Sequence, residues 1–236
     1  MSQRIVAYGA GPEQIMEVRD GRDGPRRPLV IIIHGGFWRP DIDRTHARPM
    51  ADALAAAGWS VALPEYARVL HDPEPTLQDL RALLRQPLEA LAAHDGRVVL
   101  IGHSAGGHLA LWASAARLCP RLSATLALAP VADLALAHAL KLGNGAVARF
   151  LGGGPECRPD LDPCRLPDAP AAVTLLHGLE DDTVPVALSE SYAAAHRGVR
   201  LVALPGAGHF DVIDPKSRAW ASVLAELARA AAPRPA

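Results

Sequence analysis

The sequence predicts a single α/β domain built around a mostly parallel, doubly wound sheet. Short apolar runs alternate with helical segments along the chain, which is typical of parallel strands covered on both faces. A length of 236 residues suits one such domain with one large core. Residues 1–236 are therefore expected to fold as one unit.

Each element follows from an apolar run, a helical periodicity or a turn. Segments 4–8 and 14–19 are joined by a glycine-rich turn and are expected to form an N-terminal hairpin. The further expected strands are 28–34, 60–63, 97–102, 125–129, 172–177 and 199–204. The expected helices are 43–57, 76–94, 105–117, 186–196 and 215–231. Pro87 predicts a kink or two shorter helices within 76–94, because proline removes a backbone donor.

Residues 131–170 interrupt this alternation. A helix is expected through Phe150, and three glycines and a proline-rich stretch follow it. The core pattern resumes directly afterwards at 172–177. The segment is therefore predicted to be a short lid or pocket wall inserted into the domain.

Charge and composition argue against several classes of partner. A formal net charge of −1 gives no electrostatic reason to expect a nucleic acid or an anionic membrane. The first residues lack the apolar centre of a secretory signal, and no run approaches the ~20 apolar residues of a membrane span. Cys119, Cys157 and Cys164 do not make a disulfide framework, although a Cys157–Cys164 bridge is left open. We expect a cytoplasmic protein, and a homodimer is left open.

The segment Gly102-His103-Ser104-Ala105-Gly106 matches G-x-S-x-G between a predicted strand and a predicted helix. Such a sharp turn forces strained dihedral angles on the serine, and small neighbours relieve the crowding. The turn lifts the hydroxyl above the sheet edge, beside the free N–H groups of the helix N-terminus. A glycine-rich turn without chemistry is the alternative, but this position in the fold favours Ser104 as a nucleophile.

A second glycine motif, His34-Gly35-Gly36-Phe37-Trp38, follows the first central strand, where doubly wound sheets place ligand sites. Acyl transfer puts negative charge on the former carbonyl oxygen, which preorganised N–H donors stabilise. We expect the N–H of Gly36 or Phe37, together with that of Ala105, to form this oxyanion hole. The alternative is a plain glycine turn with two aromatic residues in the core. Phe37, Trp38 and His103 are the expected substrate contacts.

The hydroxyl of Ser104 needs a base, and histidine is the usual one. Five histidines follow it: His108, His138, His177, His196 and His209. Among these, His209 is the one in a glycine-rich loop just beyond the final predicted strand. That loop can carry the ring over Ser104, so His209 is the expected base.

The base needs an orienting carboxylate, and three acidic residues follow the strand 172–177. Asp181 is chosen over Glu180 and Asp182, which are explained as solvated loop charges or as caps of the next helix. Asp133, after an earlier strand, is a weaker alternative. The carboxylate would fix the tautomer of His209 and stabilise its charged form.

Taken together, these motifs resemble the α/β-hydrolase superfamily over about residues 28–220. The string His-Gly-Gly-Phe-Trp with Gly-His-Ser-Ala-Gly-Gly-His-Leu looks like the serine-dependent kynurenine formamidase (arylformamidase) group and its small esterase relatives. The segments His-Gly-x-x-Asp-x-x-Val-Pro and Gly-His-Phe-Asp-Val-Ile fit the same group. The resemblance implies an α/β-hydrolase fold, with the acid at Asp181 and the base at His209. No metal site or cofactor is expected, because motif and packing explain His34, His103 and His108.

These residues are compatible with three functions. The first is hydrolysis of a small acyl ester or amide through an acyl-enzyme, either by an arylformamidase-like activity or by a general carboxylesterase. The second is acyl transfer or cyclisation on the same triad, with the insertion excluding water. The third, a binding module that lost its chemistry, is disfavoured because all three triad positions are filled. A small acyl compound is the expected partner.

Overall fold

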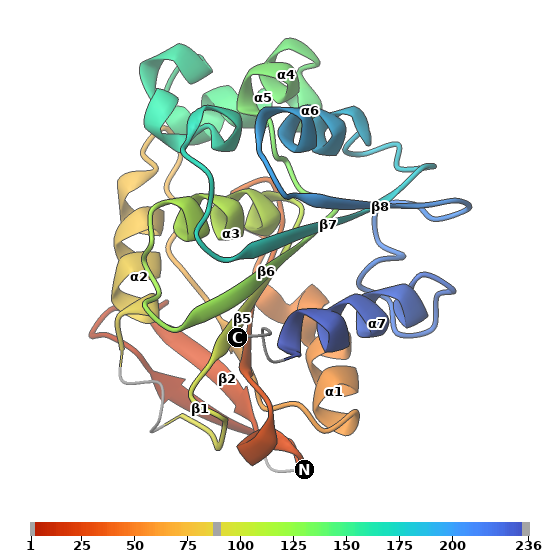
Figure 1. Cartoon of the computed structure of the whole chain (residues 1–236). Coiled ribbons are helices and arrows are strands. Elements are labelled where there is room, and N and C mark those ends of the chain that lie inside the picture. Colours follow the sequence, from red (N-terminus) through yellow and green to blue (C-terminus); the bar gives the residue numbers. More distant parts are fainter. Residues whose placement is uncertain (1–2, 87–90, 233–236) are drawn as a thin grey trace.

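The computed structural model describes residues 3–86 and 91–232, which form an eight-stranded sheet with helices on both faces (Figure 1). β1 and β2 form the predicted hairpin, β2 pairs antiparallel with β4, and all later pairings are parallel. The strands, in sheet order, are β1 (Gln3–Ala7), β2 (Ile15–Arg19), β4 (Val61–Pro64), β3 (Leu29–Ile33), β5 (Val98–His103), β6 (Leu122–Leu128), β7 (Ala172–Gly178) and β8 (Arg200–Leu204). The predicted fold class is therefore confirmed.

The continuous apolar run of β3 is explained by its two buried faces. Leu29, Ile31 and Ile33 pack into one core, and Val30 and Ile32 pack into the other. Successive side chains of a strand point to opposite faces, so a strand covered on both sides is apolar at every position. The central strands are thus buried on both faces, and the loops that contain the predicted site residues follow their carboxyl ends.

Helices cover the two faces unequally (Figure 1). One core is closed by α1 (Arg48–Ala56) and α7 (Trp220–Ala231). The other faces α2 (Glu74–Leu84), α3 (Ala105–Ala115) and α6 (Ala187–Ala195), together with the inserted segment. Every helix in the described ranges is too short or too polar to cross a bilayer.

Several element boundaries differ from the prediction. α2 ends at Leu84, so it covers only the first part of 76–94, and Pro87 lies outside the described residues. β6 begins at Leu122, three residues early, and its Ser123 hydroxyl donates to the carbonyl of Val98 in the neighbouring strand. α7 begins only at Trp220, because turns occupy the residues before it.

The insertion contains two short helices, α4 (Leu134–Ala139) and α5 (Leu142–Leu151), and then three single turns of 3₁₀ helix. α5 starts irregularly, since Gly143, Asn144 and Gly145 have φ angles of 54°, 57° and 80°. Cys119, Cys157 and Cys164 are all free thiols, so the bridge left open above is not formed.

Candidate active site

Ser104 occupies a strained turn between β5 and α3. Its φ of 56° and ψ of −120° lie in a region that side chains other than glycine rarely adopt. Backbone hydrogen bonds impose this conformation: the Ser104 N–H donates to Leu128 at 2.9 Å, and the Ser104 carbonyl accepts from His108 and Val131 at 3.1 Å each. The sharp strand-to-helix turn predicted from the motif is present.

Glycines let the surrounding backbone approach this turn. A Cβ atom on Gly106 would lie 2.1 Å from the carbonyl oxygen of Ile33 and 2.3 Å from that of His34. A Cβ on Gly35 would lie 3.0 Å from the Cβ of Ser104. The start of α3 and the loop after β3 can therefore touch only because both positions lack a side chain.

The loop after β3 runs through three consecutive residues of positive φ: Gly36 at 115°, Phe37 at 51° and Trp38 at 54°. The N–H of Arg39 donates to the Gly36 carbonyl at 3.0 Å and closes the turn. Ala105 begins α3, so its N–H has no acceptor within the helix. Gly36 and Phe37 thus line the same cavity as Ser104, and Ala105 follows Ser104 directly in the chain.

A buried charged group holds this loop in place. The ring of His34 lies 2.9 Å from a Glu65 carboxylate oxygen and stacks on Tyr66, whose hydroxyl donates to the His34 carbonyl at 2.7 Å. Arg68 pairs with Glu65 and donates to the Arg39 carbonyl at 3.0 Å. Burial alone would raise the pKa of Glu65, but the hydrogen bond from His34 and the charge of Arg68 bring it well below its ordinary range.

Sequence reasoning missed Glu65 and Arg68. Their signal was available, because Glu65 follows directly after a buried strand and Arg68 lies three residues further on, at the carboxyl edge of the sheet. Charged residues buried at such a place are unusual unless they are paired.

Asp181, the carboxylate chosen from the sequence motifs, contacts the ring of His209. The Nδ1 of His209 lies 2.7 Å from Asp181 Oδ2, and both side chains are buried. Asp182 is exposed and accepts from the Thr183 hydroxyl, and Asp133 caps α4 through the N–H of Leu136. Neither alternative carboxylate contacts His209 in the described structure.

Two backbone donors hold the Asp181 carboxylate, and a buried histidine ring lies beside it. The N–H groups of Thr183 and Val184 donate to Oδ1 at 2.9 and 2.7 Å, and the buried ring of His177 lies 3.3 Å from Oδ2. Burial would raise the pKa of Asp181, but the hydrogen bonds from His177, His209 and Val184 lower it well below its usual range. Asp181 therefore stays ionised beside the imidazole it orients.

One cavity of about 280 Å³ joins most of the predicted site residues. It is lined by Gly36, Phe37, Ile42, His46, His103, Ser104, Thr183, His209 and Phe210. Ser104 and His209 therefore open onto the same space. None of these lining residues belongs to the insertion, which instead contacts the back of Phe37 at Gly143.

The structure places Trp38 away from this cavity. Its side chain is 2% exposed, stacks on Phe150 with ring centroids 4.7 Å apart and meets His108 edge-on. The expectation that Trp38 contacts the substrate is therefore wrong in this structure. The ring of Trp38 belongs instead to the buried core, and the backbone of this residue has a positive φ of 54°.

His103 lines the cavity, but its ring N–H serves the protein itself. Its Nε2 donates to the backbone carbonyl of His209 at 3.0 Å. Burial, followed by the proximity of His209, lowers the pKa of His103 to about 3. The ring is neutral at ordinary pH. It connects the turn that contains Ser104 (the serine turn) to the loop after β8 that contains His209 (the histidine loop).

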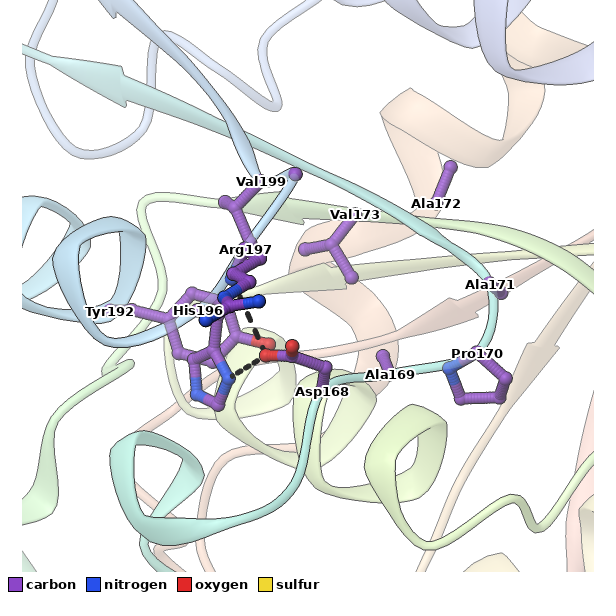
Figure 2. Close-up of a pocket in the computed structure, with 11 residues that line it drawn as sticks. Asp168, Ala169, Pro170, Ala171, Ala172, Val173, Tyr192, His196, Arg197 and Val199 are labelled. Atoms are coloured by element: carbon purple, nitrogen blue, oxygen red, sulfur yellow. Dashed lines mark hydrogen bonds and ion pairs between the residues drawn. The ribbon is translucent and has the colours of Figure 1, made fainter.

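Figure 2 shows a second cavity, of about 190 Å³, at the amino ends of β7 and β8. Asp168 binds the ring of His196 at 2.9 Å, and the other ring nitrogen lies 2.9 Å from the Pro163 carbonyl. Asp168 also accepts from the backbone N–H of Arg197 at 3.4 Å, so Asp168 and both ring nitrogens of His196 are paired with protein groups. They attach the end of the insertion to α6, and no serine or cysteine lines the space.

A small acidic cluster outside the cavity is also explained by protein contacts. Asp133, Asp162 and Cys164 bring potential ligand atoms within 4.8 Å of one another. Asp133 accepts from the Ser191 hydroxyl, and Asp162 accepts from the N–H groups of Leu134 and Cys164. These donors account for the cluster, which joins the insertion to α6.

The order of strands, with the serine turn after β5 and the histidine loop after β8, is the architecture of the α/β-hydrolases, and the protein has this fold. A family model described as BD-FAE matches residues 18–128. Esterase LipC of Mycobacterium tuberculosis is 25% identical over 90% of this chain and 60% of its own length. Esterase LipQ of the same organism is 26% identical over 88% and 57%. The chain thus spans about three fifths of these two relatives.

Solved structures agree on the fold. Esterase B from Lactobacillus rhamnosis superposes with a TM-score of 0.80, at 22% identity, over 97% of this chain and 84% of its own. An esterase from Thermogutta terrifontis gives a TM-score of 0.73, at 21% identity, over 99% and 95%. The narrower resemblance to arylformamidases is not confirmed by these matches.

Proposed function

We propose that this protein is a serine hydrolase that cleaves a small carboxylic ester through an acyl-enzyme. The observation that carries the proposal is the contact of Asp181 with His209, whose side chain lines the same cavity as Ser104. The two mycobacterial relatives named as esterases support the same class of reaction.

The proposed reaction has two halves, acylation of Ser104 and hydrolysis of the acyl-enzyme, and the same residues act in both. Ser104 Oγ attacks the carbonyl carbon while His209 Nε2 takes the hydroxyl proton, and the N–H of Ala105 with that of Gly36 or Phe37 stabilises the oxyanion. Collapse of this intermediate breaks the ester bond, and His209 returns the proton to the leaving alcohol. Water then attacks the acyl-enzyme by the same route and releases the acid. Asp181 holds the His209 ring and stabilises its positive charge throughout.

Labelling of the nucleophile tests this proposal directly. A fluorophosphonate is expected to phosphonylate Ser104 in the wild type and to leave Ser104→Ala unmodified, as read by mass spectrometry of the digested protein. Ser104→Ala should also lose ester hydrolysis by a factor of about 10³ or more. An adduct elsewhere, or full activity in the variant, would overturn the assignment.

A narrower proposal within this class is an arylformamidase-like activity. A formyl group needs little room above the oxyanion donors, and Phe37 and Phe210 offer aromatic walls beside them. A panel of phenyl esters and N-formyl aryl amines decides between the two substrates. Formamide turnover faster than ester turnover supports the narrower proposal, and slower turnover leaves a general carboxylesterase.

A further inference from the structure

The active-site cavity is apolar except for a few side chains whose hydrogen bonds can be counted. Phe37, Ile42 and Phe210 supply its apolar wall. Apart from the catalytic pair, its polar side chains are His46, His103 and Thr183.

Two of these three side chains are already committed to the protein. The Thr183 hydroxyl donates to Asp182 at 3.2 Å. His103 donates from Nε2 to the His209 carbonyl, and its Nδ1 is sealed from solvent against Gly35. His103 therefore offers no free polar atom to a substrate, and Thr183 offers only the lone pairs of a hydroxyl whose proton is already used. The remaining polar side chain is His46.

The ring of His46 is fixed in one tautomer. Its Nδ1 lies 2.9 Å from the Asp43 carbonyl oxygen, which can only accept, so Nδ1 carries the proton. Burial, followed by the nearby His34, lowers the pKa of His46, so the ring is neutral at ordinary pH. Its Nε2 is then a lone-pair acceptor, with no hydrogen-bond partner in residues 3–86 and 91–232 and without being sealed from solvent.

The backbone around His46 is also held in place. Asp43 caps the turn Arg44–Ala47 by accepting from the N–H of Thr45 at 2.9 Å. Arg44 is anchored to the buried carboxylates of Glu17 and Glu65. The ring of His46 is therefore held in a fixed position at the wall of the cavity.

We propose that His46 Nε2 accepts a hydrogen bond from the substrate, and that the protein selects acyl compounds carrying a hydroxyl or N–H donor close to the scissile carbonyl. The inference rests on the proposed hydrolase function and names its substrate class. A bound substrate without a donor would leave this acceptor unpaired in an apolar cavity, whereas one with a donor satisfies it. The expected preference is roughly tenfold in kcat/KM.

Matched pairs of esters test this selection. The acyl side is probed with phenyl propanoate against phenyl 2-hydroxypropanoate, and with phenyl butanoate against phenyl 3-hydroxybutanoate. The leaving-group side is probed with 2-methylphenyl acetate against 2-hydroxyphenyl acetate. The readout is the ratio of kcat/KM within each pair, divided by the ratio of their uncatalysed hydrolysis rates. Absolute rates do not enter the comparison.

Three variants complete the experiment. The wild type should prefer the hydroxylated member of at least one pair by roughly tenfold, and His46→Leu should bring that ratio close to one. His46→Gln, which keeps an acceptor, should restore part of it. Thr183→Val, which removes a cavity hydroxyl already paired with Asp182, should retain the preference.

The outcomes separate this inference from the proposed function. Two results overturn the selection by His46 and leave the hydrolase function standing. The esters are turned over with no hydroxyl preference in any pair, or the preference survives in His46→Leu. Absence of all ester turnover together with absence of a fluorophosphonate adduct on Ser104 overturns the hydrolase function, and the inference with it.

Discussion

His103 donates a hydrogen bond from its ring Nε2 to the backbone carbonyl of His209 across 3.0 Å. His103 ends β5 immediately before Ser104, whereas His209 belongs to the loop after β8. The two rings lie with centroids 4.7 Å apart, and both side chains are buried. The residue next to the proposed nucleophile therefore helps to hold the loop of the proposed base.

Removal of this bond should lower kcat with little change in KM. His103→Leu loses the donor and is expected to reduce kcat roughly tenfold. One neutral hydrogen bond is lost, and His209 then moves away from its catalytic position. His103→Gln, whose amide can still donate, should recover most of the rate. Steady-state kinetics on one phenyl ester measure both variants. Equal losses in the two variants at equal thermal stability would contradict this positioning role.

The assignment of Asp181 as the acid predicts that substitutions of two adjacent aspartates will reduce kcat by very different factors. Asp181→Asn should reduce kcat by about 10³–10⁴, because the amide no longer fixes the tautomer of His209 or stabilises its charge. Asp182→Asn is the matched control: its carboxylate is exposed, and its rate should stay within about twofold of the wild type. A larger loss in Asp182→Asn than in Asp181→Asn would reverse the assignment.

Support of Phe37 by the insertion can be tested with two glycines that share a left-handed backbone. A Cβ on Gly143 would lie 2.9–3.0 Å from the Phe37 ring, whereas a Cβ on Gly145 would meet no atom within 4 Å. Both alanine variants should lose about 1 kcal/mol of unfolding free energy from backbone strain. Gly143→Ala alone should also lower kcat/KM several-fold by displacing Phe37. Equal kinetics in the two variants would show that this contact does not matter for catalysis.

Buried histidines should make the protein less stable as the pH falls below about 6.5. Burial lowers the pKa of His108 to about 4, and an unfolded histidine titrates near 6.5. Between these values the unfolded chain binds a proton that the folded chain does not, so stability falls with decreasing pH. This one residue contributes about 1.4 kcal/mol per pH unit in that window.

Urea unfolding at pH 7.5 and pH 5 measures this slope. His108→Gln does not titrate and keeps a donor for the Leu161 carbonyl, to which His108 donates at 2.8 Å. The wild type should lose about 2 kcal/mol more than the variant between the two pH values. The pKa of Asp181 is lowered, whereas burial raises that of Asp162, but both carboxylates are present in the two proteins, so their contributions cancel in the difference. Parallel stability curves for the two proteins would disprove the expectation.

The sequence was informative wherever chemistry and local pattern coincide. The run at β3 is apolar because both of its faces are buried, and the spacing around Asp181 puts the carboxylate in the turn that reaches His209. The direction of Trp38 could not be predicted, because two consecutive residues with φ near 50° turn side chains away from any strand or helix periodicity.

Contacts between distant segments were equally inaccessible. The sequence shows that 131–170 is an insertion, but not that it packs behind Phe37 through Gly143. Nor does any local pattern pair His34 with Glu65, which lies 31 residues further along the chain. Such pairings depend on strand order, which the alternation of apolar runs leaves undetermined.

The backbone of Ser104 has a wider consequence. Its φ of 56° suits a glycine, so the serine is retained at a cost of about 1–3 kcal/mol in unfolding free energy. A descendant that exchanges this serine for glycine would lose its nucleophile and become more stable. Selection for catalysis and selection for robustness therefore oppose each other at this position, and gene copies freed from the first should keep the fold after their activity has gone.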